Sequence, residues 1–332
     1  MGELLLGTMG SLSELMSEGK SGSFFYYSND ALYMIKRIPQ REMSSLRRLL
    51  STYVRHVEKY PHTLLPRFMG AHRLIVPDIG KVHFVVFANV FSTDRFIHER
   101  YDLKGSTLGR TVGAETLARK ADCVRKDLDL KRQFNLGSNR DAIVAQIRAD
   151  IGFLREVQTM DYSLLVGIHY PRREPPHPDD ANKLPPTRSV SLPSDASAAG
   201  SEAARQVAAT SRQVSHPGPT GSLSGLRKES SVAEVLPLRA GATSVTGAGK
   251  ARAPWECAYD GAVAAAPPDG EEPHLYFIGI IDILTAWSPA KSFENVAKSV
   301  MHPTEKAGIS CVPPDSYADR FEKALTGWIA PG

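Results

Sequence analysis

A lysine in a predicted strand follows a glycine-rich segment, an arrangement that can hold a phosphate group. Lys36 lies in the middle of the run 33–38 and shares a strand face with Met34 and Ile38. Small residues precede this hairpin, and their backbone N–H groups could lie over phosphates: Gly19, Ser21, Gly22 and Ser23. This is not a Walker A motif, because Glu14 stands where the first glycine belongs. An ordinary turn and a solvated lysine remain the alternatives.

Three further motifs place charged groups in unusual settings. The segment 102–107 (DLKGST) contains Lys104 beside a glycine and two hydroxyls, which suit phosphate contacts. Asp161 precedes an apolar run, and Asp282 lies between two isoleucines, where a carboxylate is costly unless it is paired or bound to a metal. We interpret these acids as a base or orienting group and a Mg²⁺ ligand. The alternative for 102–107 is a capping turn before a helix. The alternative for Asp161 and Asp282 is a buried acid that accepts hydrogen bonds from backbone N–H groups.

The elements that would position these motifs form an α+β pattern. Apolar residues at spacings of three and four predict helices, and aromatic or β-branched runs flanked by turn residues predict strands. Asp315 is expected to be the N-cap of the last helix. After Tyr101 the pattern is more helical. The expected strands are 24–28, 32–38, 67–76 and 81–90, a short apolar run is 274–284, and the expected helices are 43–57, 140–158 and 315–329.

Composition divides the chain and excludes several classes of protein. The range 171–273 holds 14 of the 23 prolines and has no aromatic residue before Trp255, so we predict a disordered insert. Outside this range the chain carries 29 basic and 24 acidic residues, a net charge of +5, which suits an anionic partner. Three scattered cysteines argue against a disulfide scaffold, and the longest apolar stretch, 82–91, is too short to span a membrane.

Taken together, these motifs resemble those of the phosphatidylinositol phosphate kinases. The similar pieces occur in family order and cover nearly all of the chain outside the insert. They are GKSGSFFYYSNDALYMIKRI, FVVFANVFSTDRFIHERYDLKGST, KDLDLKRQFNL, FLREVQTMDYSLLVGIHY, YFIGIIDILTAW and AGISCVPPDSYADRF. The resemblance implies a two-lobed lipid kinase distantly related to protein kinases. The expected parts are an N-lobe (1–100), a C-lobe (101–170 and 274–330) and the insert (171–273).

The resemblance also implies roles for individual residues. Lys36 would contact the nucleotide phosphates, Asp161 would be the catalytic aspartate and Asp282 would bind Mg²⁺. Lys104 would lie near the transferred phosphate, and Arg110 would meet the lipid phosphate. The hinge facing the adenine of ATP would be 87–90, with Phe87, Asn89 and Val90 as contacts.

Substrate choice in this family is linked to the segment 291–295, where Lys291 and Glu294 match the 4-phosphate 5-kinases. Ser292 and Asn295 depart from the lysine and histidine expected there, which weakens the expected contact with an anionic membrane. We therefore expect an enzyme that uses ATP and Mg²⁺ to phosphorylate the 5-hydroxyl of phosphatidylinositol 4-phosphate. A different lipid specificity and a non-catalytic phosphoinositide-binding scaffold are the alternatives. A protein kinase is disfavoured by the lack of HRD, DFG and APE motifs.

The expected partner is phosphatidylinositol 4-phosphate in an anionic membrane, with peripheral membrane association and no nucleic acid. The resemblance allows a homodimer, and it places the protein in the cytoplasm and on the cytoplasmic face of the plasma membrane. The family usually has further helices and a strand before the part that matches residues 3–18, so we expect the chain to be a fragment or an incomplete sequence.

Overall fold

The computed structural model describes residues 13–16, 24–28, 31–76, 80–93, 95–119, 123–173, 263–264, 272–301 and 308–331. These residues belong to one compact unit of the chain, and a second unit, 190–236, lies outside the described residues. Within the described part, no helix combines the length and apolar character needed to cross a membrane.

The first sheet is antiparallel and carries Lys36. Its strand order is β1-β2-β3-β5-β4. The predicted hairpin is confirmed, since Tyr27 pairs with Met34 across β2 and β3, and so are the two later strands. Strand β1 was not predicted. The bounds are β1 Ser13–Met16, β2 Phe24–Tyr27, β3 Tyr33–Ile38, β4 Phe68–Val76 and β5 Gly80–Ala88.

Helix α2 (Gln40–Lys59) follows β3 directly and confirms the helix predicted for this range. Its apolar stripe is buried, with Met43, Leu46, Leu49 and Tyr53 each at most 4% exposed. Burying a stripe of this kind stabilises a helix far more than its intrinsic propensity does. The helix therefore fixes the strand that carries Lys36 to the shared hydrophobic core.

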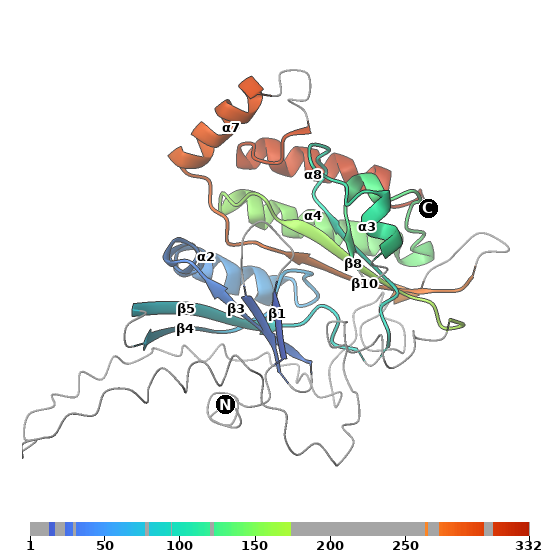
Figure 1. Ribbon diagram of the computed structural model, residues 1–332, viewed down its shortest axis with the longest axis horizontal. Coiled ribbons are helices and arrows are strands. Elements are labelled where there is room, and N and C mark those ends of the chain that lie inside the picture. Colours follow the sequence, from blue (N-terminus) through green and yellow to red (C-terminus); the bar gives the residue numbers. More distant parts are fainter. Residues whose placement is uncertain are drawn as a thin grey trace, which may run out of the picture. The chain divides into compact units, whose positions relative to one another are not determined.

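The second sheet has the order β7-β6-β8-β10-β9, and one of its faces is covered by α4 and α8. These two helices run side by side in Figure 1, and Arg148 and Arg155 of α4 form ion pairs with Glu322 and Asp319 of α8. The bounds are β6 Glu99–Leu103, β7 Val124–Arg125, β8 Ser163–His169, β9 Val263–Ala264, β10 Leu275–Ile281, α4 Arg140–Glu156 and α8 Pro314–Trp328. The remaining elements are α3 Ala114–Arg119, α7 Pro289–Met301 and two 3₁₀ turns, η2 Asp127–Asp129 and η3 Gly137–Asn139.

The structure corrects three details of the sequence prediction. The region after Tyr101 is more helical, as predicted, but β6 and β8, two interior strands of the second sheet, were not among the predicted strands. Asp315 is not the N-cap of α8; Pro313 is, and Pro314 occupies the first turn, where its missing N–H costs nothing. Strand β9 lies inside the range predicted as the insert and pairs with β10, so this part of the range belongs to the second sheet.

The two ends of the described chain around this insert are held together. Tyr170 directly follows β8. The guanidinium of Arg173 lies 3.7 Å from the centroid of the Tyr170 ring. Arg173 also forms a 2.8 Å ion pair with Glu272, just before β10. Because Ile168 of β8 and Val263 of β9 both pair with Tyr276 of β10, the described residues that border 174–262 lie at the same end of one sheet. The structure of most of that segment lies outside the described residues.

Candidate active site

Lys36 and Asp282 form an ion pair that joins the two sheets. The Nζ of Lys36, in β3, donates to Oδ1 of Asp282, just after β10, at 2.8 Å. Burial acts to raise the pKa of Asp282, but the attraction and hydrogen bond of Lys36 outweigh it and hold that pKa below its ordinary value. Burial likewise acts to lower the pKa of Lys36, and the pairing with Asp282 raises it instead. Both groups therefore remain charged at neutral pH.

A second lysine–aspartate pair forms beside the first. The Nζ of Lys104 donates to Oδ1 and to the backbone carbonyl of Asp161, each at 2.8 Å. After Lys36, Lys104 also helps to hold the pKa of Asp282 low, so the two pairs interact electrostatically. The structure thus brings together four residues that the sequence singled out from separate motifs.

The register of one strand pair explains why the two aspartates meet. Ile281 at the end of β10 pairs with Ser163 at the start of β8, so Asp282 and Asp161 emerge at the same end of the sheet. Both residues have left-handed backbones, with φ of 64° at Asp161 and 62° at Asp282. This conformation is uncommon for residues other than glycine, although aspartate tolerates it better than most, and such residues concentrate at functional sites.

Arg110 is not free to bind a lipid phosphate in this conformation. Its guanidinium donates from Nε to Asp127 at 2.6 Å and from Nη2 to Asp102 at 2.7 Å, and its side chain is only 11% exposed. Burial acts to lower the pKa of Arg110, but the two carboxylates outweigh it and raise that pKa. A lipid phosphate would have to compete with both acids for this guanidinium.

Glu294 binds the two lysines of its own helix. Its carboxylate accepts from Lys291 at 2.8 Å and from Lys298 at 2.5 Å, so the three side chains carry a net charge of only one. Burial acts to raise the pKa of Glu294, but these lysines hold it below its ordinary value. Helix α7 is tied to the chain after it, because Asn295 donates to the carbonyl of Cys311. Burial acts to lower the pKa of Lys291, but Glu294 raises it overall, and the charge of Asp161 adds to that rise.

The predicted hinge connects the two sheets, although its side chains are partly used for structure. Phe87 packs against the main core, and the side-chain amide of buried Asn89 donates to the carbonyl of Ala31 at 2.9 Å. Val90 packs on Gly279 so closely that an added Cβ there would lie 2.7 Å from Val90 Cγ2. The predicted glycine-loop residues Gly19, Ser21, Gly22 and Ser23 lie outside the described residues.

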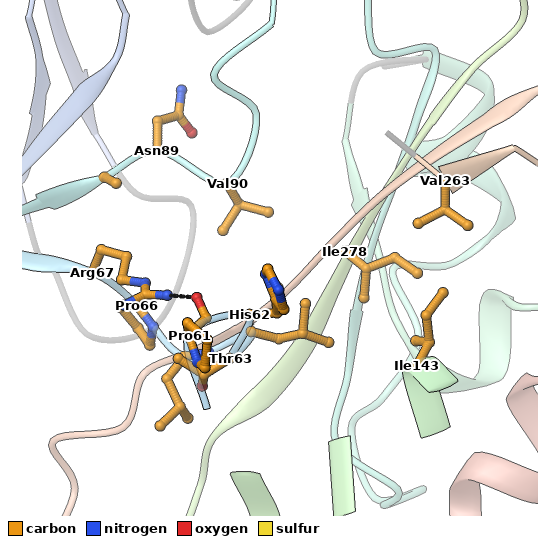
Figure 2. Close-up of a pocket in the computed structure, with 14 residues that line it drawn as sticks. Pro61, His62, Thr63, Pro66, Arg67, Asn89, Val90, Ile143, Val263 and Ile278 are labelled. Carbon is orange, nitrogen blue, oxygen red and sulfur yellow. Dashed lines mark hydrogen bonds between the residues drawn. The ribbon is translucent and has the colours of Figure 1, made fainter. Parts of the chain in front are cut away.

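A pocket of about 200 Å³ adjoins the hinge but is not the site of the ion pairs. Val90, Ile143 and Ile278 point into it in Figure 2, whereas Asn89 points away. Arg67 closes one side and donates to the carbonyl of Pro61. Neither lysine–aspartate pair lines this pocket. We therefore assign the chemistry to the charged groups and not to this cavity.

The carboxylates present suit magnesium held together with nucleotide phosphates. Among the described residues, no three His, Cys, Asp or Glu side chains converge to hold a metal on their own. Mg²⁺ in kinase sites is commonly bound by one or two carboxylates, with phosphates and water supplying the other ligands. Asp282, which is charged and 41% exposed, fits that partial donor set. Lys36 beside it is placed to contact the same phosphates.

Two residues near the site were not predicted from the sequence. Glu42, in the first turn of α2, lies close enough to Lys36 and Asp282 for both to influence its pKa, which burial raises. Asp127 accepts hydrogen bonds from the loop that carries Lys104. Asp127 lies in the motif KDLDLKRQFNL, but the motif gave no indication of which acid faces the site.

Comparison with known proteins decides the family. The family model for phosphatidylinositol-4-phosphate 5-kinase matches residues 6–327. The chain belongs to this family. It is 35% identical to a probable phosphatidylinositol phosphate kinase of Dictyostelium discoideum and 35% identical to phosphatidylinositol 4-phosphate 5-kinase its3 of Schizosaccharomyces pombe, over 95% and 96% of its length. It is 34% identical over 93% of its length to phosphatidylinositol 4-phosphate 5-kinase 8 of Arabidopsis thaliana.

The alignments cover only part of these phosphatidylinositol phosphate kinases. This chain spans 42% of the length of each of the three relatives. The match to the family model nevertheless includes all four residues of the lysine–aspartate pairs.

Proposed function

We propose that this chain transfers the γ-phosphate of ATP to the 5-hydroxyl of phosphatidylinositol 4-phosphate, giving phosphatidylinositol 4,5-bisphosphate. The observation that carries the proposal is the meeting of the Lys36–Asp282 and Lys104–Asp161 pairs at one end of β8 and β10. Phosphoryl transfer depends mainly on positioning and on neutralising charge, and these pairs supply both. The names of the relatives support the choice of substrate.

Each of the four residues has a distinct proposed task. Asp282 would hold Mg²⁺, which neutralises charge on the ATP phosphates, and Lys36 would bind those phosphates. Asp161 would orient the attacking hydroxyl and accept its proton, and Lys104 would lie against the transferred group. In the described conformation the lysines neutralise the aspartates, so substrate binding would replace ion pairs within the chain with contacts to phosphate.

Helix α7 supports the proposed attachment to an anionic membrane. It carries four large apolar side chains that are more than half exposed, and no other described helix exposes such a set: Phe293, Val296, Val300 and Met301. An amphipathic helix with exposed apolar residues can lie in the headgroup region of a bilayer. Since Glu294 neutralises much of the charge of Lys291 and Lys298, apolar insertion would contribute more than charge. The membrane would be the cytoplasmic face of the plasma membrane.

Glu294 is the proposed determinant of lipid specificity because it lies on this helix, in the segment 291–295 that resembles the 4-phosphate 5-kinases. When the lipid headgroup binds Glu294, it would displace Lys291 and Lys298 from this carboxylate, and both lysines could then contact the lipid phosphates. The distant relationship of the fold to protein kinases and a homodimeric assembly remain proposals that rest on the resemblance alone.

The decisive experiment is a phosphate transfer assay on mixed vesicles containing phosphatidylinositol 3-, 4- and 5-phosphates, followed by identification of the product headgroup. The proposal expects phosphatidylinositol 4,5-bisphosphate made from the 4-phosphate. The same bisphosphate made only from the 5-phosphate would assign a 4-kinase. Vesicle binding without transfer would favour the scaffold.

A further inference from the structure

A 3₁₀ turn behind the active site holds the loop that carries Lys104. The Oδ1 of Asp127, in η2, accepts the backbone N–H groups of Lys104 at 3.0 Å and Gly105 at 2.8 Å. Its other oxygen accepts Nε of Arg110 at 2.6 Å. Asp127 is 8% exposed, so this carboxylate works in a largely buried setting, where hydrogen bonds to a charged acceptor are strong.

The loop needs such support because it leaves β6 without regular structure. Gly105 has φ of 68°, and an added Cβ there would lie 3.0 Å from the Cβ of Ala324 in α8. The loop therefore turns sharply against a helix immediately after Lys104. The described acceptor for the N–H groups of Lys104 and Gly105 at this turn is Asp127.

The same turn also fixes Arg110. The N–H of Leu128 donates to the carbonyl of Arg110 at 2.9 Å, and Asp102 holds the far side of its guanidinium. One short segment thus sets the position of two cationic residues that flank the site. A shift of Asp127 would move both together.

We propose that Asp127 is a positioning residue for phosphoryl transfer. It fixes the backbone at Lys104 so that Nζ reaches Oδ1 and the backbone carbonyl of Asp161, and it also orients Arg110. The expected effect on kcat rests on the proposed function, whereas the hydrogen bonds from Lys104 and Gly105 to Asp127 do not. Misplacing a catalytic group by ~1 Å can cost ~100-fold in rate, so a loss of this support would be felt mainly in kcat.

Asp129 provides a matched control in the same turn. It accepts the N–H of Lys126 at 2.9 Å, the N–H of Val112 at 3.1 Å and the hydroxyl of Thr111 at 2.6 Å. Its contacts are of the same kind as those of Asp127. They do not include Lys104 or the guanidinium of Arg110.

The test compares Asp127→Ala, Asp127→Asn and Asp129→Ala in the full chain. Amide hydrogen exchange over 103–106 should speed up at least tenfold in Asp127→Ala relative to Asp129→Ala, because two N–H groups lose their acceptor. In vesicle assays, kcat should fall ~100-fold in Asp127→Ala, with KM for ATP within twofold of the parent. Asp127→Asn keeps an acceptor oxygen for the two amides, so its kcat should recover at least tenfold over the alanine variant.

Two results would overturn the proposal. The first is unchanged exchange at 103–106 in Asp127→Ala. The second is an active parent whose Asp127→Ala variant loses no more kcat than Asp129→Ala. If the parent protein transfers no phosphate, the proposed function is refuted instead. The exchange measurement then tests only whether Asp127 holds the backbone at Lys104 and Gly105. If Asp127→Ala shows no melting transition, the same comparison is made with Asp127→Leu, which fills the space of the side chain but offers no acceptor oxygen. Unchanged exchange at 103–106 in that folded variant, together with kcat no lower than in Asp129→Ala, overturns the proposal.

Discussion

Ser163 in β8 and Ile281 in β10 are direct cross-strand partners, and this single pairing places Asp161 and Asp282 side by side at one end of the second sheet. Each aspartate then meets a lysine from a different segment, at 2.8 Å in both pairs. Shifting the register by one residue would turn every side chain of β10 to the opposite face. The proposed site is therefore a consequence of strand register as much as of the motifs.

Asp282→Asn should abolish transfer and leave the fold nearly intact. The amide has the volume of the carboxylate and tolerates the left-handed backbone at this position, but it lacks the charge that Mg²⁺ requires. The Lys36 pair is partly exposed, so its loss should cost no more than ~1 kcal/mol of stability. Thermal melting and transfer assays would check this, with Asp141→Asn as an exposed control. Full activity in Asp282→Asn would refute the metal assignment.

Glu99→Gln should destabilise the protein at neutral pH but not in acid. Burial acts to raise the pKa of Glu99, but hydrogen bonds from Tyr101 and Tyr170 and the charge of Arg132 lower it overall. Because the pKa of Glu99 is lower in the folded protein, its ionised carboxylate stabilises the fold at any pH above the ordinary pKa of 4.5. This stabilisation is lost as the pH falls through the lower pKa of the folded state. We expect a loss of ~1–3 kcal/mol at pH 7. Denaturant unfolding at pH 7 and pH 3.5 should show the gap narrowing; a constant gap would contradict the prediction.

Replacing 174–262 with a short glycine-serine linker should leave activity within a few-fold of the parent. The sequence predicts that this segment buries little apolar surface. The residues that border it lie at the same end of one sheet, because Ile168 of β8 and Val263 of β9 both pair with Tyr276 of β10. A short loop can therefore connect residues 173 and 263. Expression, melting and transfer assays on the deletion would test this. Collapse of the fold would show that the segment supports the core.

Adding charge to the exposed face of α7 should weaken membrane binding while sparing nucleotide binding. Phe293 and Val300 are 75% and 74% exposed, so changing both to Asp costs little folding stability but opposes entry into an anionic interface. Vesicle co-sedimentation should fall at least tenfold, and ATP binding should be unchanged. The control is Leu74→Asp with Ile75→Asp, which charges two exposed apolar residues of β4. Equal losses in both double variants would mean that α7 is not the membrane contact.

Local sequence patterns were sufficient for the elements with strong periodicity. The apolar stripes of α2 and α4 and the hairpin around Lys36 could be predicted because each element's own residues dictate its period. The motifs also singled out the two lysines and two aspartates that the structure brings together. Strands β6 and β8 were harder to predict, because a strand buried in the middle of a sheet lacks the alternation that marks a half-exposed one.

The sequence by itself determined the chemical inventory, namely Lys36, Lys104, Asp161 and Asp282, the family, and a segment poor in core-forming residues. Only the tertiary structure decided which lysine faces which aspartate, that Arg110 is clamped by two carboxylates and that Asp127 holds the Lys104 loop. Partners such as Lys36 and Asp282, 246 residues apart, are set by strand register and core packing. No local pattern encodes such a pairing, because its energy depends on the burial and charges of both segments once they have been brought together.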